Sequence, residues 1–196
     1  MDQNLLYIQN VNMNEIPWHR ITTTYGRATK FPQCFKSICD MEDIVIVKNA
    51  LNEVTSNIEH QSTLWHATPF AMIFLVRLFE RAVSKRDNSE IAKFITERLL
   101  DFFSVVAVCF HDGDEMEHED QLPLFSDMLK EEYLWSEEYD ETEDLMYYEE
   151  GEAFPDDLFF SFYYYSYQVL LTCKPALQQL NSTILDTKAK ELQELL

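Results

Sequence analysis

Apolar residues recur every three or four positions along most of this chain, which is the spacing of one face of an α-helix. The clearest stretch covers residues 71–82, where the preceding Thr-Pro pair at 68–69 is a helix start signal. A second stretch covers residues 88–110, and the very short connection predicts that the two helices are antiparallel. Asp43 and Pro155 predict two more helix starts, and the helix after Pro155 is apolar on nearly every side, which indicates a central position.

The rest of the pattern is also helical. Further helices are expected at residues 17–26, from Pro32, at 123–135, at 141–150, from Pro175 and from Thr183. Only 3 glycines occur, which argues against antiparallel sheets because their tight turns use glycine. Grouped in order, the helices form pairs within residues 16–57, 68–110, 114–150 and 155–196. Although no residue-level repeat is visible, this period predicts an all-α fold, a solenoid of about four antiparallel helix pairs in a single domain over residues 1–196. Its core is expected to include Trp18, Tyr25, Phe74, Leu75 and Phe94.

The negative charge is concentrated in residues 112–157, which hold 20 of the 35 acidic residues and one of the 15 basic ones. Such a field repels nucleic acid and anionic membranes, and it attracts a basic partner, whose encounter it speeds by roughly 10–10³-fold at low salt. The alternative is that the region is only a solvated face or an acidic loop. Large apolar residues such as Phe125, Trp135 and Tyr148 interrupt the charges, however, which indicates that the region packs or binds.

Several classes of function find no support in the sequence. The longest apolar stretch, residues 102–110, is too short to span a bilayer, and the first residues do not form a secretory signal. We therefore expect a cytoplasmic protein that does not bind membranes. No Gly-x-Ser-x-Gly, Walker or Cys-His nucleophile motif occurs, so neither enzyme activity nor a cofactor is expected.

Histidines, cysteines and carboxylates are the side chains that could ligate a metal ion. Four candidates lie close together in the sequence, namely His111, Asp114, Glu117 and His118. Their spacing matches neither His-Glu-x-x-His nor an EF-hand loop, so no metal is expected. His60 and His66 precede a helix start and are interpreted as partners of backbone groups. The cysteines form no Cys-x-x-Cys pair and have apolar neighbours, so we expect reduced, buried thiols. They are Cys34, Cys39, Cys109 and Cys173.

Two segments carry a resemblance to a known family. They read IPWHRITTTYGRATKFPQCFKSI over residues 16–38 and IEHQSTLWHATPFAMIFLVRLFERAV over residues 58–83. Together they resemble the opening of bacterial HEAT-repeat-like proteins, in which a Trp precedes Ala-Tyr-Gly-x-Ala, a helix, and then His-Gln-Gly-Thr-x-Tyr-x-Ala-Thr-x-x-Ala-x-x-Phe-Leu. The matching positions are Trp18, Tyr25, Gly26, Ala28, Pro32, His60, Gln61, Thr63, Ala67, Thr68, Pro69, Ala71, Phe74 and Leu75. Thr24, Ser62 and Trp65 depart from the pattern, which has Ala, Gly and Tyr there.

The resemblance implies a HEAT-like α-solenoid and a place in the immunity group of polymorphic toxin systems, small cytoplasmic proteins that bind and silence a cognate toxin. Many such toxins are nucleases, whose clefts are basic because they hold phosphates. An acidic surface with aromatic anchors would occlude such a cleft. The candidate partner-binding residues are Glu131, Glu132, Trp135, Glu137, Glu138, Tyr139, Asp140, Glu141, Tyr147 and Tyr148. The alternative is a HEAT-like helical scaffold or regulator that has no toxin partner.

Overall fold

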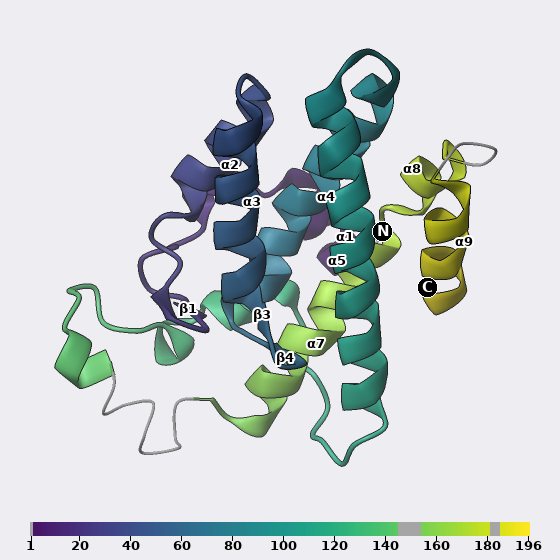
Figure 1. Cartoon of the computed structure of the whole chain (residues 1–196). Coiled ribbons are helices and arrows are strands. Elements are labelled where there is room, and N and C mark those ends of the chain that lie inside the picture. The colour runs from purple at the N-terminus through teal and green to yellow at the C-terminus, as the bar shows by residue number, and fades with distance from the viewer. Residues whose placement is uncertain (1, 145–153, 181–184) are drawn as a thin grey trace.

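The computed structural model describes residues 2–144, 154–180 and 185–196, and helices dominate it (Figure 1). The α-helices are α1 (Gln3–Asn10), α2 (Phe31–Asp40), α3 (Ile44–Ile58), α4 (Ala67–Lys85), α5 (Glu90–Asp114), α7 (Asp156–Leu171), α8 (Lys174–Gln178) and α9 (Asp186–Leu195). The 3₁₀ segments in these described ranges are η1 (Met13–Glu15), η2 (Arg86–Asn88), η3 (Phe125–Leu129) and η4 (Glu131–Tyr133). Two hairpins consist of β1 (Thr22–Thr23) with β2 (Gly26–Arg27) and β3 (Glu59–His60) with β4 (Thr63–Leu64). The predicted all-α class is confirmed.

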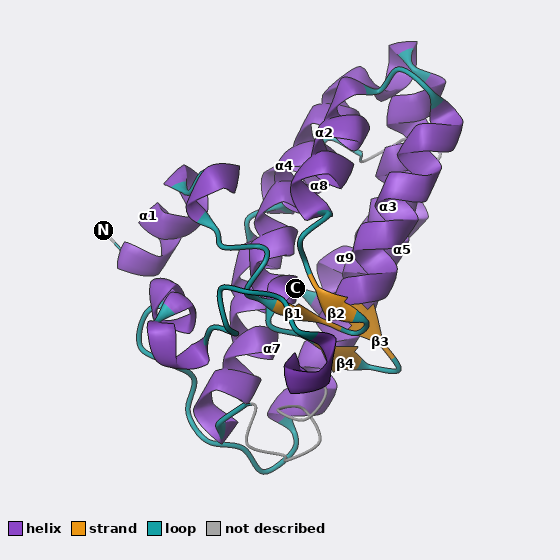
Figure 2. Ribbon diagram, turned by 90° about the vertical axis from the view of Figure 1, so that its left-hand side faces the viewer, coloured by secondary structure: helices purple, strands orange, loops and turns teal. Residues whose placement is uncertain are grey.

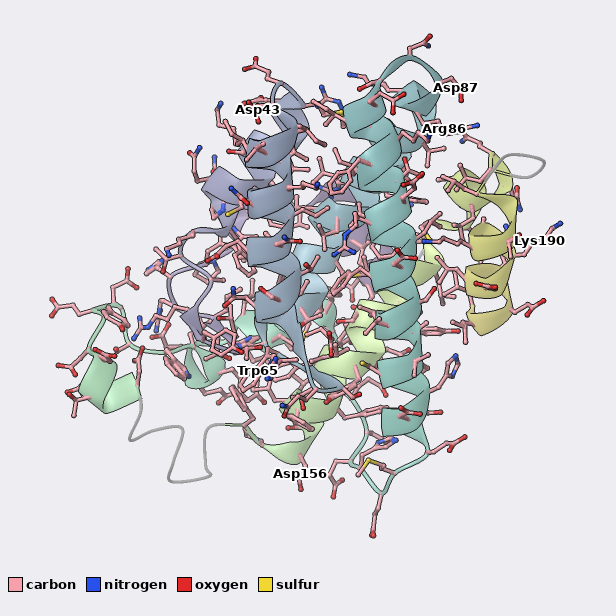
Figure 3. All side chains as sticks on the ribbon, viewed as in Figure 1. Asp43, Trp65, Arg86, Asp87, Asp156 and Lys190 are labelled. Atoms are coloured by element: carbon pink, nitrogen blue, oxygen red, sulfur yellow. The ribbon has the colours of Figure 1, made fainter. Side chains whose placement is uncertain are left out.

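The centre of the molecule is formed by α4, α5 and α7, each of which packs against the other two. The short η2 reverses the chain between α4 and α5, at the end of the molecule where Arg86 and Asp87 lie (Figure 3). Across this pair the rings of Phe79 and Phe103 meet edge to face, with their centroids 5.4 Å apart. α7 is buried along most of its length, so its predicted central position is confirmed. The helices α2 and α3 cover one side of this centre, and α9 covers α5 (Figure 1).

Two helix starts agree with the capping residues in the sequence. The carboxylate of Asp43 accepts from the backbone N–H groups of Val45 and Ile46, at 2.7 and 3.1 Å. The hydroxyl of Ser89 accepts from the N–H of Ala92 at the start of α5. Each bond satisfies a donor that the first turn of a helix leaves without a partner. α4 begins at Ala67, one residue before the predicted Thr-Pro signal.

The helix predicted over residues 17–26 is wrong, because part of this range forms the β1–β2 hairpin. Ile21 and the threonines after it are branched at Cβ, which favours extended backbone. Gly26 ends the turn at φ 108°, a conformation that other residues rarely adopt. A second hairpin, β3–β4, follows α3, so a low glycine content does not exclude short hairpins.

The helix predicted over residues 123–135 is also wrong, since η3 and η4 occupy this range. Lys130 separates them with extended backbone at φ −64° and ψ 147°. Residues 141–144 are helical, whereas 145–150 of the other predicted acidic helix lie outside the described residues. The pairs α2–α3 and α4–α5 form, but the described part of residues 114–150 does not form a helix pair. The sequence pattern did not predict α1.

The buried apolar residues form one continuous core that includes Trp18, Phe74 and Leu75, as predicted. Phe94 is partly buried against this core. The prediction for Tyr25 is wrong, because its side chain stands at the tip of the β1–β2 hairpin with 69% of its surface exposed.

The cysteines are free thiols, as the sequence predicts. Cys109 and Cys173 are buried, and burial raises the pKa of each thiol to about 12. The expectation of full burial is wrong for Cys34 and Cys39, which are half-buried. None of the helices in the described ranges is long and apolar enough to cross a bilayer.

Candidate protein-binding site

The first part of the acidic region is packed into the fold by its apolar residues. The N–H of Leu122 donates to the hydroxyl of Ser161 at 2.8 Å, and the carbonyl of Leu122 accepts from the hydroxyl of Tyr165 at 2.6 Å. Phe125 is fully buried, and its ring lies 5.2 Å from Phe70 and 4.9 Å from Tyr165. Residues 122–129 are therefore bound to α4 and α7 and are not a solvated acidic loop.

His66 also connects this segment to the helical centre. Its Nε2 lies 2.8 Å from the backbone carbonyl of Met128, and because a carbonyl only accepts, Nε2 carries the proton. The imidazole is fully buried and stacks on Phe162. Burial lowers its pKa to about 4, so His66 is neutral at pH 7. The interpretation of His66 as a partner of the backbone is confirmed.

Arg20 binds the next part of the acidic region. Its Nη1 and Nη2 donate to the two carboxylate oxygens of Glu131, at 3.0 and 2.5 Å, and its Nε donates to the carbonyl of Trp135 at 2.6 Å. The N–H of Trp135 in turn donates to the carbonyl of Arg20. The hydrogen bonds from Arg20 stabilise the charged form of Glu131 and lower its pKa.

Arg27 fixes the following turn. Its Nε and Nη2 donate to the carboxylate oxygens of Asp144, at 2.7 and 2.6 Å, and its Nη1 donates to the carbonyl of Ser136 at 2.7 Å. The guanidinium also lies over the rings of Trp135 and Tyr139, at 5.5 and 5.4 Å from their centroids. With 3% of its side chain exposed, Arg27 is enclosed by residues 135–144. We call the surface that residues 131–144 form the acidic face.

The acidic face leaves most of its predicted partner-binding residues at the surface. Its exposed residues are Glu131, Glu132, Glu137, Glu138, Tyr139, Asp140 and Glu141. Among these, Glu131 pairs with Arg20, and Glu137 contacts His19 at 2.8 Å. The side chain of Trp135 is 8% exposed, so most of it packs inside the protein. Tyr147 and Tyr148 lie outside the described residues.

A cleft of about 620 Å³ lies between the acidic face and the two hairpins. We call it the hairpin cleft. The two hairpins sit side by side (Figure 2). Both hairpins, Trp65, the start of α7 and the acidic face contribute to the walls of the cleft. Its lining residues in the described part of the chain are Thr22, Thr23, Thr24, Tyr25, Gly26, His60, Gln61, Thr63, Leu64, Trp65, Trp135, Tyr139, Glu141, Asp144, Phe154, Phe159 and Phe162. Trp65 lies beside the lower end of α3, and Asp43 marks the opposite end of that helix (Figure 3).

Hydrogen bonds to α3 and α7 hold the hairpins in place beside the cleft. Thr24 is bound to α3: its N–H and its hydroxyl both donate to the carbonyl of Asn57, at 2.9 and 3.2 Å. The N–H of Leu64 donates to the hydroxyl of Tyr163 on α7. At the rim, the ring of His60 meets the ring of Tyr25, with centroids 5.7 Å apart.

Two of the residues weighed as metal ligands, His111 and His118, contact other parts of the protein. His111 Nε2 lies 2.8 Å from the carbonyl of Leu195, and His118 stacks on Phe160 with centroids 3.4 Å apart. Asp114 lies 3.8 Å from His118. Within the described ranges, no three His, Cys, Asp or Glu side chains converge as they would around a metal ion.

Sequence reasoning missed Arg20 and Arg27, which fix the acidic face, and Phe159, which lines the cleft. Arg20 lies in the segment predicted as a helix and Arg27 directly follows that segment, where both side chains would have been expected in solvent. The only signal was the excess of acidic residues in the distant region, which requires cations wherever it contacts the body of the protein. Comparisons of the chain with protein-family models, with curated proteins and with solved structures find no match.

Proposed function

We propose that this chain binds a basic protein through its acidic face and neutralises it, as a cytoplasmic immunity protein does with its cognate toxin. One observation carries the proposal. Glu138, Asp140, Glu141 and Glu143 are exposed and form no ion pair with the described residues, although Arg27 holds the turn that bears them. The protein therefore presents an ordered group of uncompensated carboxylates.

Such a surface suits a basic catalytic cleft. Carboxylates at an exposed rim mainly accelerate encounter, whereas buried anchors slow dissociation. In the proposed complex the carboxylates occupy positions where a nuclease toxin would hold phosphates, and so block access to its active site. Because the field repels polyanions, neither nucleic acid nor a membrane is part of the proposal.

The HEAT-like relationship belongs to the same proposal. Its support is the packing of two consecutive helix pairs, α2–α3 and α4–α5, each joined by a short connection. In a solenoid each pair buries its apolar face against the next, and here α4 contacts both helices of the preceding pair. The resemblance of residues 16–38 and 58–83 to HEAT-like immunity proteins points in the same direction.

The first experiment is co-purification with the product of the upstream neighbouring gene, followed by inhibition of that product's activity. We expect a stable complex in which toxicity is lost. A helical scaffold without a toxin partner would instead leave the upstream product active and unbound.

The second experiment measures association with this partner at low and high salt. Replacing Glu132, Glu138, Asp140 and Glu141 by Gln or Asn should slow association by about tenfold or more at low salt. The matched control replaces Glu42, Glu90, Glu191 and Glu194 by Gln, which gives the same net charge with the acidic face intact. Equal effects of the two variants would show that only net charge matters, and would contradict binding through the acidic face.

A further inference from the structure

We propose that the hairpin cleft is an arginine-binding subsite, which receives the side chain of an arginine from a loop of the basic partner. The inference rests on the proposed function for the source of that arginine. It adds a specific contact to the general attraction of the acidic face.

The aromatic rings of the cleft suit a guanidinium group. Tyr25, Trp65, Tyr139 and Phe159 line it, and two of these rings are well exposed, Tyr25 with 69% of its surface and Tyr139 with 65%. A planar guanidinium stacks on aromatic faces and is weakly hydrated, so it enters such a site more readily than an ammonium group does.

The protein already contains this mode of binding. Arg27 lies over the rings of Trp135 and Tyr139 and donates two hydrogen bonds to Asp144. All three of these partners also line the hairpin cleft, whereas Arg27 does not. An arginine that enters from the cleft would meet the same kind of wall from the other direction.

The charge of the cleft also favours a cation. No Lys or Arg is among the lining residues in the described part of the chain. The charge of Asp144 is balanced by Arg27, but Glu141 is exposed and forms no ion pair with the described residues. Glu141 is therefore the carboxylate that remains available to an incoming guanidinium.

Thr22 provides a second, independent indication of a ligand. The residue is 1% exposed and lines the cleft, yet its hydroxyl oxygen has no hydrogen-bond partner among the described residues. A buried hydroxyl without a partner destabilises the folded protein. An N–H of a bound guanidinium would supply the missing bond.

Backbone conformation at the rim is consistent with a binding site. Gln61 and Ser62 both have positive φ, 52° and 64°, in the turn between β3 and β4. Non-glycine residues hold such a conformation at a cost, and conformations of this kind cluster at functional sites. The cleft volume of about 620 Å³ exceeds that of one side chain, so adjoining loop residues would enter with the arginine.

The test uses the full chain and two synthetic hexapeptides, Ac-Gly-Ser-Arg-Gly-Ser-Gly-NH₂ and the same peptide with citrulline in place of arginine. Citrulline has nearly the same shape but no charge. Binding is followed by NMR through the indole N–H signals of the three tryptophans. Trp65 and Trp135 line the cleft, whereas Trp18 does not and is an internal control.

We expect the arginine peptide to shift the signals of Trp65 and Trp135 and to bind at least about tenfold more tightly than the citrulline peptide. Glu141→Gln should remove most of that difference. Thr22→Val should weaken arginine binding about threefold to tenfold without loss of stability, since it removes a hydroxyl that has no partner. Val45→Ala, at the far end of α3, is the matched control and should leave binding unchanged.

Equal binding of the two peptides, signal shifts confined to Trp18, or no binding of either peptide would each overturn the arginine subsite. These outcomes are distinct from failure of the proposed function, because the peptides contain no toxin. Co-purification with the upstream product but no arginine binding would leave the acidic face as the interface. Arginine binding without co-purification would preserve the subsite and refute the toxin partner.

Discussion

Arg27 and Asp144 lie 117 positions apart in the sequence, yet Nε and Nη2 of Arg27 donate to the two carboxylate oxygens of Asp144. The two side chains are 3% and 11% exposed. Burial of either charge alone is costly, so each requires the other. This pair joins the acidic face to the β1–β2 hairpin, where sequence patterns predicted a helix.

Replacement of Arg27 by Ala should lower the free energy of unfolding by about 3–5 kcal/mol, because it leaves Asp144 buried without a counterion. The double variant R27A/D144A should lose less than the two single losses added together, and urea unfolding of all four proteins measures that coupling. Arg27→Lys should not restore stability, since an ammonium group cannot form the two parallel bonds. Additive losses would show that the pair is not a coupled unit.

Phe125 tests whether the acidic region is part of the core. Phe125→Ala should reduce stability by about 3–5 kcal/mol, since the ring is fully buried. The control is Met116→Ala in the same acidic region, where 70% of the side chain is exposed and a change within about 0.5 kcal/mol is expected. Thermal or urea unfolding distinguishes the two, and similar small effects would place residues 122–129 outside the cooperative unit.

The turn at Ser62 predicts a stabilising substitution. Because Ser62 has φ 64°, Ser62→Gly should relieve strain and raise stability by about 0.5–1 kcal/mol. The same substitution at Ser56, within α3, should have the opposite sign and cost about 0.5 kcal/mol, since glycine is a poorer helix former. A loss of stability in both variants, measured by urea unfolding, would contradict the strain at Ser62.

His66 predicts a pH dependence of stability. Its pKa is about 4 in the folded protein, against 6.5 as the ordinary value, so the unfolded chain takes up the proton first as the pH falls. The contribution of His66 to the free energy of unfolding is fully present above about pH 6.5, and about 3 kcal/mol of it is lost by the time the pH reaches 4.

The measurement for His66 compares the wild type with His66→Gln by urea unfolding between about pH 7 and pH 5. Gln retains a donor for the carbonyl of Met128 but does not titrate, so the variant should lose less stability over this range. Because the carboxylates titrate in both proteins, their contribution cancels in the difference. Parallel pH profiles would indicate that the pKa of His66 is the same in the folded and the unfolded protein, and would contradict the lowered pKa.

The longer helices could be predicted because several local signals agree within each of them. In α3 and α5 a capping side chain, Asp43 or Ser89, precedes a sustained apolar period. The hairpins were missed because a strand of two residues is too short to show a period. The helix over residues 17–26 was predicted from Pro17 and Gly26, but Gly26 belongs to a turn that Asn57 holds from another element.

The candidate site could be predicted only as a region. Excess charge in residues 112–157 indicated where a basic partner would bind, but not which carboxylates the protein uses internally. Nothing in the sequence distinguishes the paired carboxylates Glu131 and Asp144 from Glu132 and Glu141. The difference is visible only in the structure, where Arg20 and Arg27 lie beside the first two. Such contacts join residues more than a hundred positions apart, so no local pattern reports them.

Because the acidic face is attached through Arg20 and Arg27, its carboxylates differ in how well the fold tolerates their substitution. Asp144 is buried with Arg27 and maintains the shape of the surface, so its replacement should destabilise the fold, whereas Glu131 is exposed and its pair with Arg20 contributes less. Glu138 and Glu141 form no side-chain hydrogen bond or ion pair with the described residues, and they can be exchanged with little effect on folding. A surface of this kind can follow a rapidly changing partner by substitution at its outer positions, while the two arginines keep the framework constant.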